Sequence, residues 1–273
     1  MLQYEFMQNA FIVAIAIAIL CPCIGIFLVL RRYSMIGDTL SHASLAGISL
    51  ALTVGGNPLL GAFIFTAFCG ALIEFLRGFF KKNADLILSV VLALCVGIAI
   101  TLISSGKVHA SAESFLFGSV LTVTRGDMTI ALALSVLTIG VLAIFYNQLV
   151  FIAYDEETAA VAGVRVKLIN YIFSILVAAA VSVAIRVVGV LVLSSMIALP
   201  VAAALQLGRG FRATLALSIL FSVTDIIAGI TIAYYLNVAP GGFTAIVSVA
   251  TLLLAIVGKQ LTRTINGHLK GGM

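Results

Sequence analysis

Apolar runs of about twenty residues, separated by short polar breaks, fill almost all of this chain. Of its 273 residues, 63% are hydrophobic and 9% are charged, whereas a soluble domain carries about a quarter charged residues. A helix of about 20 apolar residues is long enough to cross a bilayer. Because lipid offers the backbone no hydrogen-bond partners, such runs fold as helices. The sequence therefore predicts an all-α polytopic membrane protein.

The apolar runs predict nine membrane spans, with eight as the alternative count. The alternative arises near Val187-Val188-Gly189, where two spans could form one kinked helix. Residues 1–273 are expected to form a single transmembrane domain. Met1–Asn9 contains no basic residue, so the first run is expected to be retained as a span and not cleaved as a signal. The predicted spans are residues 10–30, 38–54, 58–79, 84–104, 127–150, 168–187, 189–207, 212–236 and 242–258.

The basic residues lie between the spans and predict the orientation of the chain. In one orientation, twelve of the fifteen lie in the cytoplasm and only Lys107, Arg125 and Arg186 lie outside, as the positive-inside rule favours. This orientation places the N-terminus outside and the C-terminus in the cytoplasm. The net charge of +5 is not gathered on one face, so we expect membrane lipid and no nucleic acid as a partner.

A polar interruption, Gly37–Ser44, contains the best candidate for a functional site. Asp38 and His42 are four residues apart, which on a helix separates them by about 40° around the axis and about 6 Å along it. Both side chains can therefore reach one cation, and a carboxylate with an imidazole suits zinc or manganese. The alternative is structural: Asp38 caps the helix and His42 packs in the core. The membrane setting favours the metal site, since ionisable groups in lipid usually mark a transport route.

Three further ionisable residues are candidates for a secondary pathway. His109 and Glu113 repeat the four-residue spacing in the long connection after residue 104, where they could guide a cation or form a solvated helix face. Asp225 is the only acid well inside the eighth span. It could line the pathway or bond to backbone at a helix break.

An acidic segment between two spans predicts a short helix outside the membrane, at about 155–166. Asp155, Glu156 and Glu157 precede the small residues Thr158 and Ala159, and acids at a helix N-terminus complement its dipole. A glycine at position 163 can end such a helix. We interpret the segment as a docking surface for a partner, with a solvated loop helix as the alternative.

Enzymatic motifs are missing from the sequence. It contains no phosphate-binding G-x-x-x-x-G-K-[ST] loop, no H-E-x-x-H and no G-x-S-x-G. The four cysteines, Cys21, Cys23, Cys69 and Cys95, lie in apolar runs, and we expect neither a disulfide nor a cysteine metal site. The chain is therefore expected to be a transport protein and not an enzyme.

The segment Arg31–Leu45, RRYSMIGDTLSHASL, resembles the signature of membrane permeases from bacterial ATP-binding-cassette importers of zinc and manganese. The resemblance extends to four further segments: Phe115–Ser119, the acidic helix from Asp155, Gly189–Val192 with Pro200–Ala204, and Ala239–Gly242. It implies the fold of type II importer permeases in a bacterial inner membrane. The pattern Gly-Asp-Thr-x-x-His-Ala-Ser looks closer to the zinc branch than to the manganese branch.

The resemblance also implies partners. These are a second copy of the chain forming a homodimeric pore, a cytoplasmic ATPase subunit docking on residues 155–163, and an extracellular or periplasmic metal-binding protein. It implies that Asp38 and His42 bind Zn²⁺ or Mn²⁺ in transit. ATP would be used by the partner, and this chain would bind no cofactor of its own. Two alternatives are a secondary metal/proton transporter and an importer permease for an iron chelate or vitamin.

Overall fold

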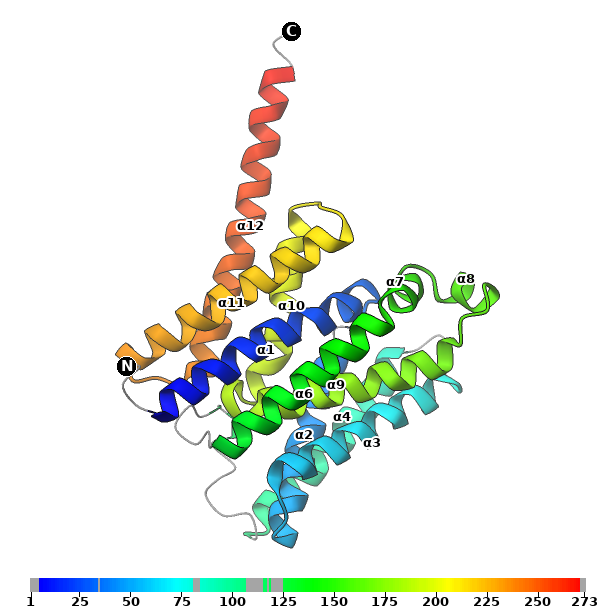
Figure 1. Ribbon diagram of the computed structural model, residues 1–273, viewed down its shortest axis with the longest axis vertical. Coiled ribbons are helices and arrows are strands. Elements are labelled where there is room, and N and C mark those ends of the chain that lie inside the picture. Colours follow the sequence, from blue (N-terminus) through cyan, green and yellow to red (C-terminus); the bar gives the residue numbers. More distant parts are fainter. Residues whose placement is uncertain are drawn as a thin grey trace.

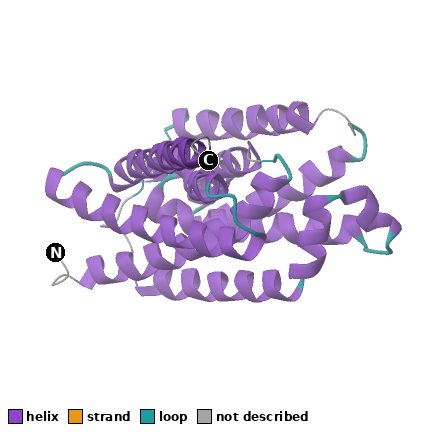
Figure 2. Cartoon of the chain, turned by 90° about the horizontal axis from the view of Figure 1, so that it is seen from above, coloured by secondary structure: helices purple, strands orange, loops and turns teal. Residues whose placement is uncertain are grey.

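Every secondary-structure element in the described part of the chain is a helix (Figure 2). The computed structural model describes residues 5–33, 35–80, 84–106, 115, 116, 118 and 125–270. This confirms the predicted all-α class. The helices are α1 (Glu5–Leu30), α2 (Met35–Val54), α3 (Pro58–Arg77), α4 (Ala84–Ser104), α6 (Arg125–Ile144), α7 (Tyr146–Tyr154), α8 (Glu156–Val161), α9 (Val166–Val188), α10 (Val190–Gln206), α11 (Phe211–Leu236) and α12 (Pro240–Lys270).

Eight of the nine predicted spans each coincide with one helix and the ninth with the pair α6 and α7, but the helices differ in how well they suit a bilayer. Within the described residues, six are long and apolar enough to cross a membrane, or up to seven if α6 and α7 form one broken span. Two predicted spans fall outside that group: α2, which carries polar side chains such as Asp38 and His42, and the shorter apolar helix α10.

The predicted span over residues 127–150 is not one straight helix, because the structure breaks it at Phe145 into α6 and α7, bent by 68°. No glycine or proline marks this break. Instead, the bend brings the Tyr146 ring against Phe211 at the start of α11, with ring centroids 5.7 Å apart. A tertiary contact between segments far apart in sequence accompanies the bend, and the apolar pattern of the span contains no sign of it.

At the junction Val187-Val188-Gly189 the structure has two helices. The chain leaves α9 after Val188, passes through Gly189 with φ +84° and ψ +161°, and enters α10 at Val190. Only glycine adopts such a positive φ without strain. Of the two alternatives open at Val187-Val188-Gly189, two separate helices is therefore the one observed.

The core of the bundle lies around α1, α2, α9 and α10, which contribute most of the fully buried side chains. By contrast, α12 rises away from the other helices towards its C-terminal end (Figure 1). Its Leu253, Leu254, Val257 and Leu261 are exposed. Cys69 on α3 and Cys95 on α4 meet between those helices with their Sγ atoms 3.6 Å apart, and all four cysteines are free thiols.

Candidate metal site and coupling helix

Helix α2 is held on several sides by its neighbours. A Cβ on Gly37 would lie 3.5 Å from Ile197 of α10, so the start of α2 packs directly on α10. Further along, Gly47 approaches Gly61 of α3 so closely that a Cβ would lie 2.4 Å from the Gly61 carbonyl oxygen. Most residues from Ile36 to Ser49 are buried. The helix therefore has little freedom to rotate, and what remains exposed on it is defined by the fold.

The half-buried residues in this stretch of α2 are Asp38 and His42. Their side chains are 36% and 23% exposed, and His42 Nε2 lies 3.9 Å from Asp38 Oδ1. The hydroxyls around them bond within the helix: Thr39 Oγ1 donates to the Met35 carbonyl and Ser41 Oγ to the Gly37 carbonyl. The structure thus brings the predicted pair together on one face.

The structural alternative for Asp38 is not what the structure shows. Helix α2 begins at Met35, so Asp38 lies inside the first turn and not at the cap position. Within the described residues, the Asp38 carboxylate accepts no backbone hydrogen bond. The polar contact that the Asp38 and His42 side chains make there is the one with each other. A carboxylate and an imidazole that are not engaged by their own fold can bind a cation.

The described residues of one chain supply too few ligands to hold a metal by themselves. No group of three or more His, Cys, Asp or Glu side chains that could hold a metal ion occurs in the described part of the chain. Structural zinc sites almost always have four ligands, and catalytic sites three protein ligands and a water. As a metal site, the pair Asp38 and His42 would therefore supply only half of a four-ligand shell.

The acidic segment forms the short helix α8, which ends at Val161 and is shorter than the predicted 155–166. Asp155 is its N-cap and accepts hydrogen bonds from the backbone N–H of Glu157 and Thr158, at 3.0 and 3.1 Å. Thr158 Oγ1 also donates to the second carboxylate oxygen. These hydrogen bonds, the Thr158 hydroxyl first, lower the pKa of Asp155. After the helix, Gly163 takes φ +87° and turns the chain towards α9.

The outer surface of α8 is available for contact. Glu157, Thr158 and the flanking Tyr154 are exposed, and Val161 is 91% exposed, whereas Ala159 is fully buried and anchors the helix. Figure 1 shows α8 at one end of the bundle, beyond the ends of α3 and α9. An acidic helix with an exposed apolar side chain at its end is a suitable surface for docking.

Six side chains that the sequence reasoning did not group together meet beside α8. They come from the residues that follow α1, from the end of α3, and from α8 and α9, and we refer to them as the Glu156 cluster: Arg31, Tyr33, Glu74, Arg77, Glu156 and Asn170. The one available signal was Glu74, an acid within an apolar run and three residues before a basic one.

The other predicted residues do not join the Asp38 and His42 pair. Asp225 is 1% exposed, and its Oδ1 accepts a 2.6 Å hydrogen bond from Thr251 Oγ1 of α12. No hydrogen bond or ion pair between described residues links it to α2. The predicted pair His109 and Glu113 lies outside the described residues.

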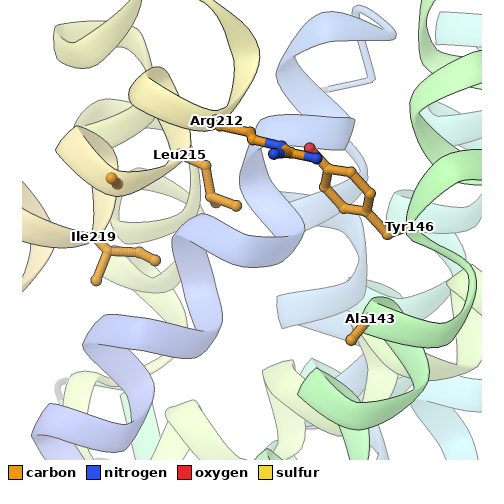
Figure 3. A pocket seen from close by; sticks show the side chains of 6 residues that line it. Ala143, Tyr146, Arg212, Leu215 and Ile219 are labelled. Carbon is orange, nitrogen blue, oxygen red and sulfur yellow. The ribbon is translucent and has the colours of Figure 1, made fainter.

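A separate cavity of about 420 Å³ lies between the bend of α6 and α7 and the start of α11. Figure 3 shows Tyr146 and Arg212 pointing towards each other across it, with Leu215 and Ile219 on its α11 side. Its lining is largely apolar and contains none of the predicted metal ligands. We therefore do not assign this cavity to the metal site.

Comparison with known proteins identifies the family. Residues 3–259 match the model of the ABC 3 transport family. A protein of Treponema pallidum named "Probable metal transport system membrane protein" is 54% identical over 96% of this chain and 99% of its own length. The manganese import system permease protein ScaB of Streptococcus gordonii is 29% identical over 93% and 91%.

A solved structure is similar over the same extent. The structure titled "PsaBC from Streptococcus pneumoniae in complex with Fab" contains a chain that superimposes with a TM-score of 0.83, at 28% identity, over 93% of this chain and 92% of that one. These matches cover nearly the whole sequence and include the segment Arg31–Leu45. The chain therefore belongs to the ABC 3 transport family, which confirms its resemblance to the permeases of ATP-binding-cassette metal importers.

Proposed function

We propose that this chain is the permease subunit of an ATP-driven importer that carries a divalent transition metal into a bacterial cell, and that Asp38 and His42 are transient ligands of that metal. The observation that carries the proposal is their geometry. A carboxylate and an imidazole lie 3.9 Å apart and half-exposed in the stretch Ile36–Ser49 of α2, which is otherwise buried. In lipid, such an uncompensated polar pair is costly, so it is expected to have a use in transport.

The metal is bound, in this proposal, between two copies of the chain. A two-fold axis passing near the exposed face of α2 would place two carboxylates and two imidazoles around one point, which satisfies tetrahedral zinc. The lack of a third ligand among the described residues of one chain supports a shared site. The proposed homodimer would also explain why Asp38 and His42 have no other polar partner among the described residues.

The transported ion is Zn²⁺ or Mn²⁺. The Gly-Asp-Thr motif favours zinc, while the names of relatives such as ScaB support manganese. Mixed oxygen and nitrogen ligands accommodate both metals, and affinity alone ranks zinc above manganese. Uptake of each metal in the presence of the other is the measurement that separates them.

Helix α8 is proposed to dock the separate ATPase subunit in the cytoplasm, since this chain has no phosphate-binding loop. Asp155 caps the helix, Glu157 and Thr158 are exposed for contact, the buried Ala159 holds the helix against the bundle, and Gly163 lets the chain turn back into α9. A metal-binding protein delivers the ion on the opposite side. With α8 in the cytoplasm, the N-terminus lies outside and the C-terminus lies in the cytoplasm.

The experiment uses the permease assembled with its ATPase subunit and metal-binding protein in proteoliposomes. We expect ATP-dependent uptake of Zn²⁺ or Mn²⁺ by the wild type, and loss of that uptake in Asp38→Asn and in His42→Ala without loss of the folded dimer. Asp85→Asn is the matched control, because Asp85 is an exposed acid in the first turn of α4. It should transport normally.

Two outcomes would overturn the proposal. Full uptake by Asp38→Asn and His42→Ala would remove these residues as ligands. Uptake by the permease alone, driven by a proton gradient without the ATPase subunit, would instead identify a secondary transporter.

A further inference from the structure

Glu156, the first residue of α8, is bonded to three other helical segments. Its Oε2 accepts from Arg77 Nη2 at 3.1 Å and lies 3.5 Å from Arg31 Nη2, and its Oε1 accepts from Asn170 Nδ2 at 3.1 Å. One carboxylate therefore holds the ends of α1, α3 and α9 to the proposed docking helix. Bonds of this kind, with ionised partners, are the stronger hydrogen bonds in proteins.

The rest of the Glu156 cluster makes this junction rigid. Arg77 also donates to both carboxylate oxygens of Glu74 at 3.0 Å, and Arg31 donates to Asn170 Oδ1 at 3.0 Å. Both guanidinium groups lie near the Tyr33 ring, 5.5 and 4.8 Å from its centroid. Each of the two arginines thus has more than one partner, so that α8 cannot shift without displacing several side chains.

The cluster is also largely removed from water. The Arg31 side chain is 6% exposed and that of Glu74 is 9% exposed, whereas that of Glu156 is 40% exposed. Burial lowers the pKa of Arg31, and the charge of Glu156 opposes that effect. Removing one member of a buried ion pair leaves a charge without compensation. Arg31 therefore depends on Glu156 for its charge partner, whereas Arg77 also has Glu74.

Two backbone hydrogen bonds link this cluster to α1 and to α2, the helix that carries Asp38 and His42. Arg31 and Tyr33 lie between α1 and α2, and α2 starts at Met35. The Tyr33 amide donates to the Leu28 carbonyl at 2.8 Å, and the Ile36 amide donates to the Tyr33 carbonyl at 3.0 Å. Asp38 follows Ile36 by two residues. A displacement of Arg31 or Tyr33 is thus passed to the first turn of α2.

We propose that Glu156 is a positioning residue that links movement of α8 to the position of Asp38 and His42. This inference rests on the proposed function. When the ATPase subunit moves α8, the Glu156 cluster draws the connection between α1 and α2 with it as a rigid body, as in other transitions in which packed elements move together. ATP hydrolysis and metal release are then coupled through one carboxylate, which acts on the ligands without touching the ion.

The test compares Glu156→Gln with the exposed-acid control Asp85→Asn in the same three-component proteoliposomes. Two rates are measured together: ATP hydrolysis and uptake of Zn²⁺ or Mn²⁺. We expect Glu156→Gln to retain hydrolysis while the number of ions moved per ATP falls about fivefold or more, the range typical of coupling between sites. The control should keep the wild-type ratio.

A merely structural role predicts a different pattern, in which assembly, thermal stability and hydrolysis all decline with uptake and the ratio stays constant. Asn170→Ala provides a second, milder variant, because it removes the hydrogen bonds of Asn170 to Glu156 and from Arg31 but leaves both charged groups in place. It should lower the ratio in the same direction. If Glu156→Gln does not assemble, a wild-type ratio in Asn170→Ala overturns the inference.

The result also separates this inference from the proposed function. Absence of ATP-dependent uptake in the wild type would refute the proposed function itself. Normal wild-type uptake with an unchanged ratio in Glu156→Gln would refute the role of Glu156 alone.

Discussion

Replacing Gly47 by alanine is expected to force α2 and α3 apart. A Cβ at this position would lie 2.4 Å from the Gly61 carbonyl oxygen and 2.8 Å from Phe65 Cβ, whereas ordinary contacts begin at 3.4 Å. The Cβ would therefore lie about 1 Å too close to the oxygen, and the two helices must separate by about 1 Å. The obstructing atom belongs to the backbone and cannot rotate away. Small residues allow this kind of close helix packing in membranes.

The size of the effect follows from two opposing contributions. Overpacking costs about 1–3 kcal/mol, whereas alanine favours a helix over glycine by about 1 kcal/mol. Gly97→Ala isolates the second contribution, because no atom lies within 4 Å of a Cβ built on Gly97 of α4. The two variants should therefore differ by about 1–3 kcal/mol, or about 5- to 150-fold in the equilibrium constant of unfolding.

The assay is reversible unfolding of the purified permease in mixed micelles, followed by far-ultraviolet circular dichroism, with wild type and both variants measured side by side. We expect Gly97→Ala to equal or exceed the wild type in stability. Gly47→Ala should be clearly less stable than Gly97→Ala. Metal uptake should fall in Gly47→Ala alone, since α2 carries Asp38 and His42. Equal unfolding curves for the two variants would refute the close approach of α2 to α3.

Two further predictions concern α8 and the contact between α11 and α12. Because hydrogen bonds from Thr158 lower the pKa of Asp155, the cap stabilises α8 fully above the usual carboxyl pKa and is lost as the pH falls through the lowered value; amide-exchange protection in α8 should fall in acid, and Asp155→Asn should abolish that dependence. Thr251→Val leaves the buried Asp225 Oδ1 without its donor and should destabilise the protein by about 1–3 kcal/mol in thermal unfolding, whereas Thr231→Val, on an exposed face of α11, should have little effect.

Local chemistry alone determined the positions of the helices, the pairing of Asp38 with His42 and the cap of α8. Lipid leaves an apolar backbone no alternative to the helix, so the nine runs of hydrophobic residues coincide with helices of the structure. A spacing of four residues puts two side chains on one helix face wherever that helix is placed, which is why Asp38 and His42 were found as a pair. The cap of α8 was predictable for the same reason, because Asp155 and Thr158 are neighbours in sequence.

Only the tertiary structure decided which helix faces meet. The bend at Phe145 accompanies a contact with Phe211, and the Glu156 cluster unites residues separated by up to 139 positions in the chain. No periodicity within one helix contains that information, since it depends on the shapes of two surfaces that form independently and on how closely Gly47 and Gly61 let them approach. The sequence therefore shows where the helices and the pair Asp38 and His42 are, while the connection between α8 and α2 exists only once the bundle is packed.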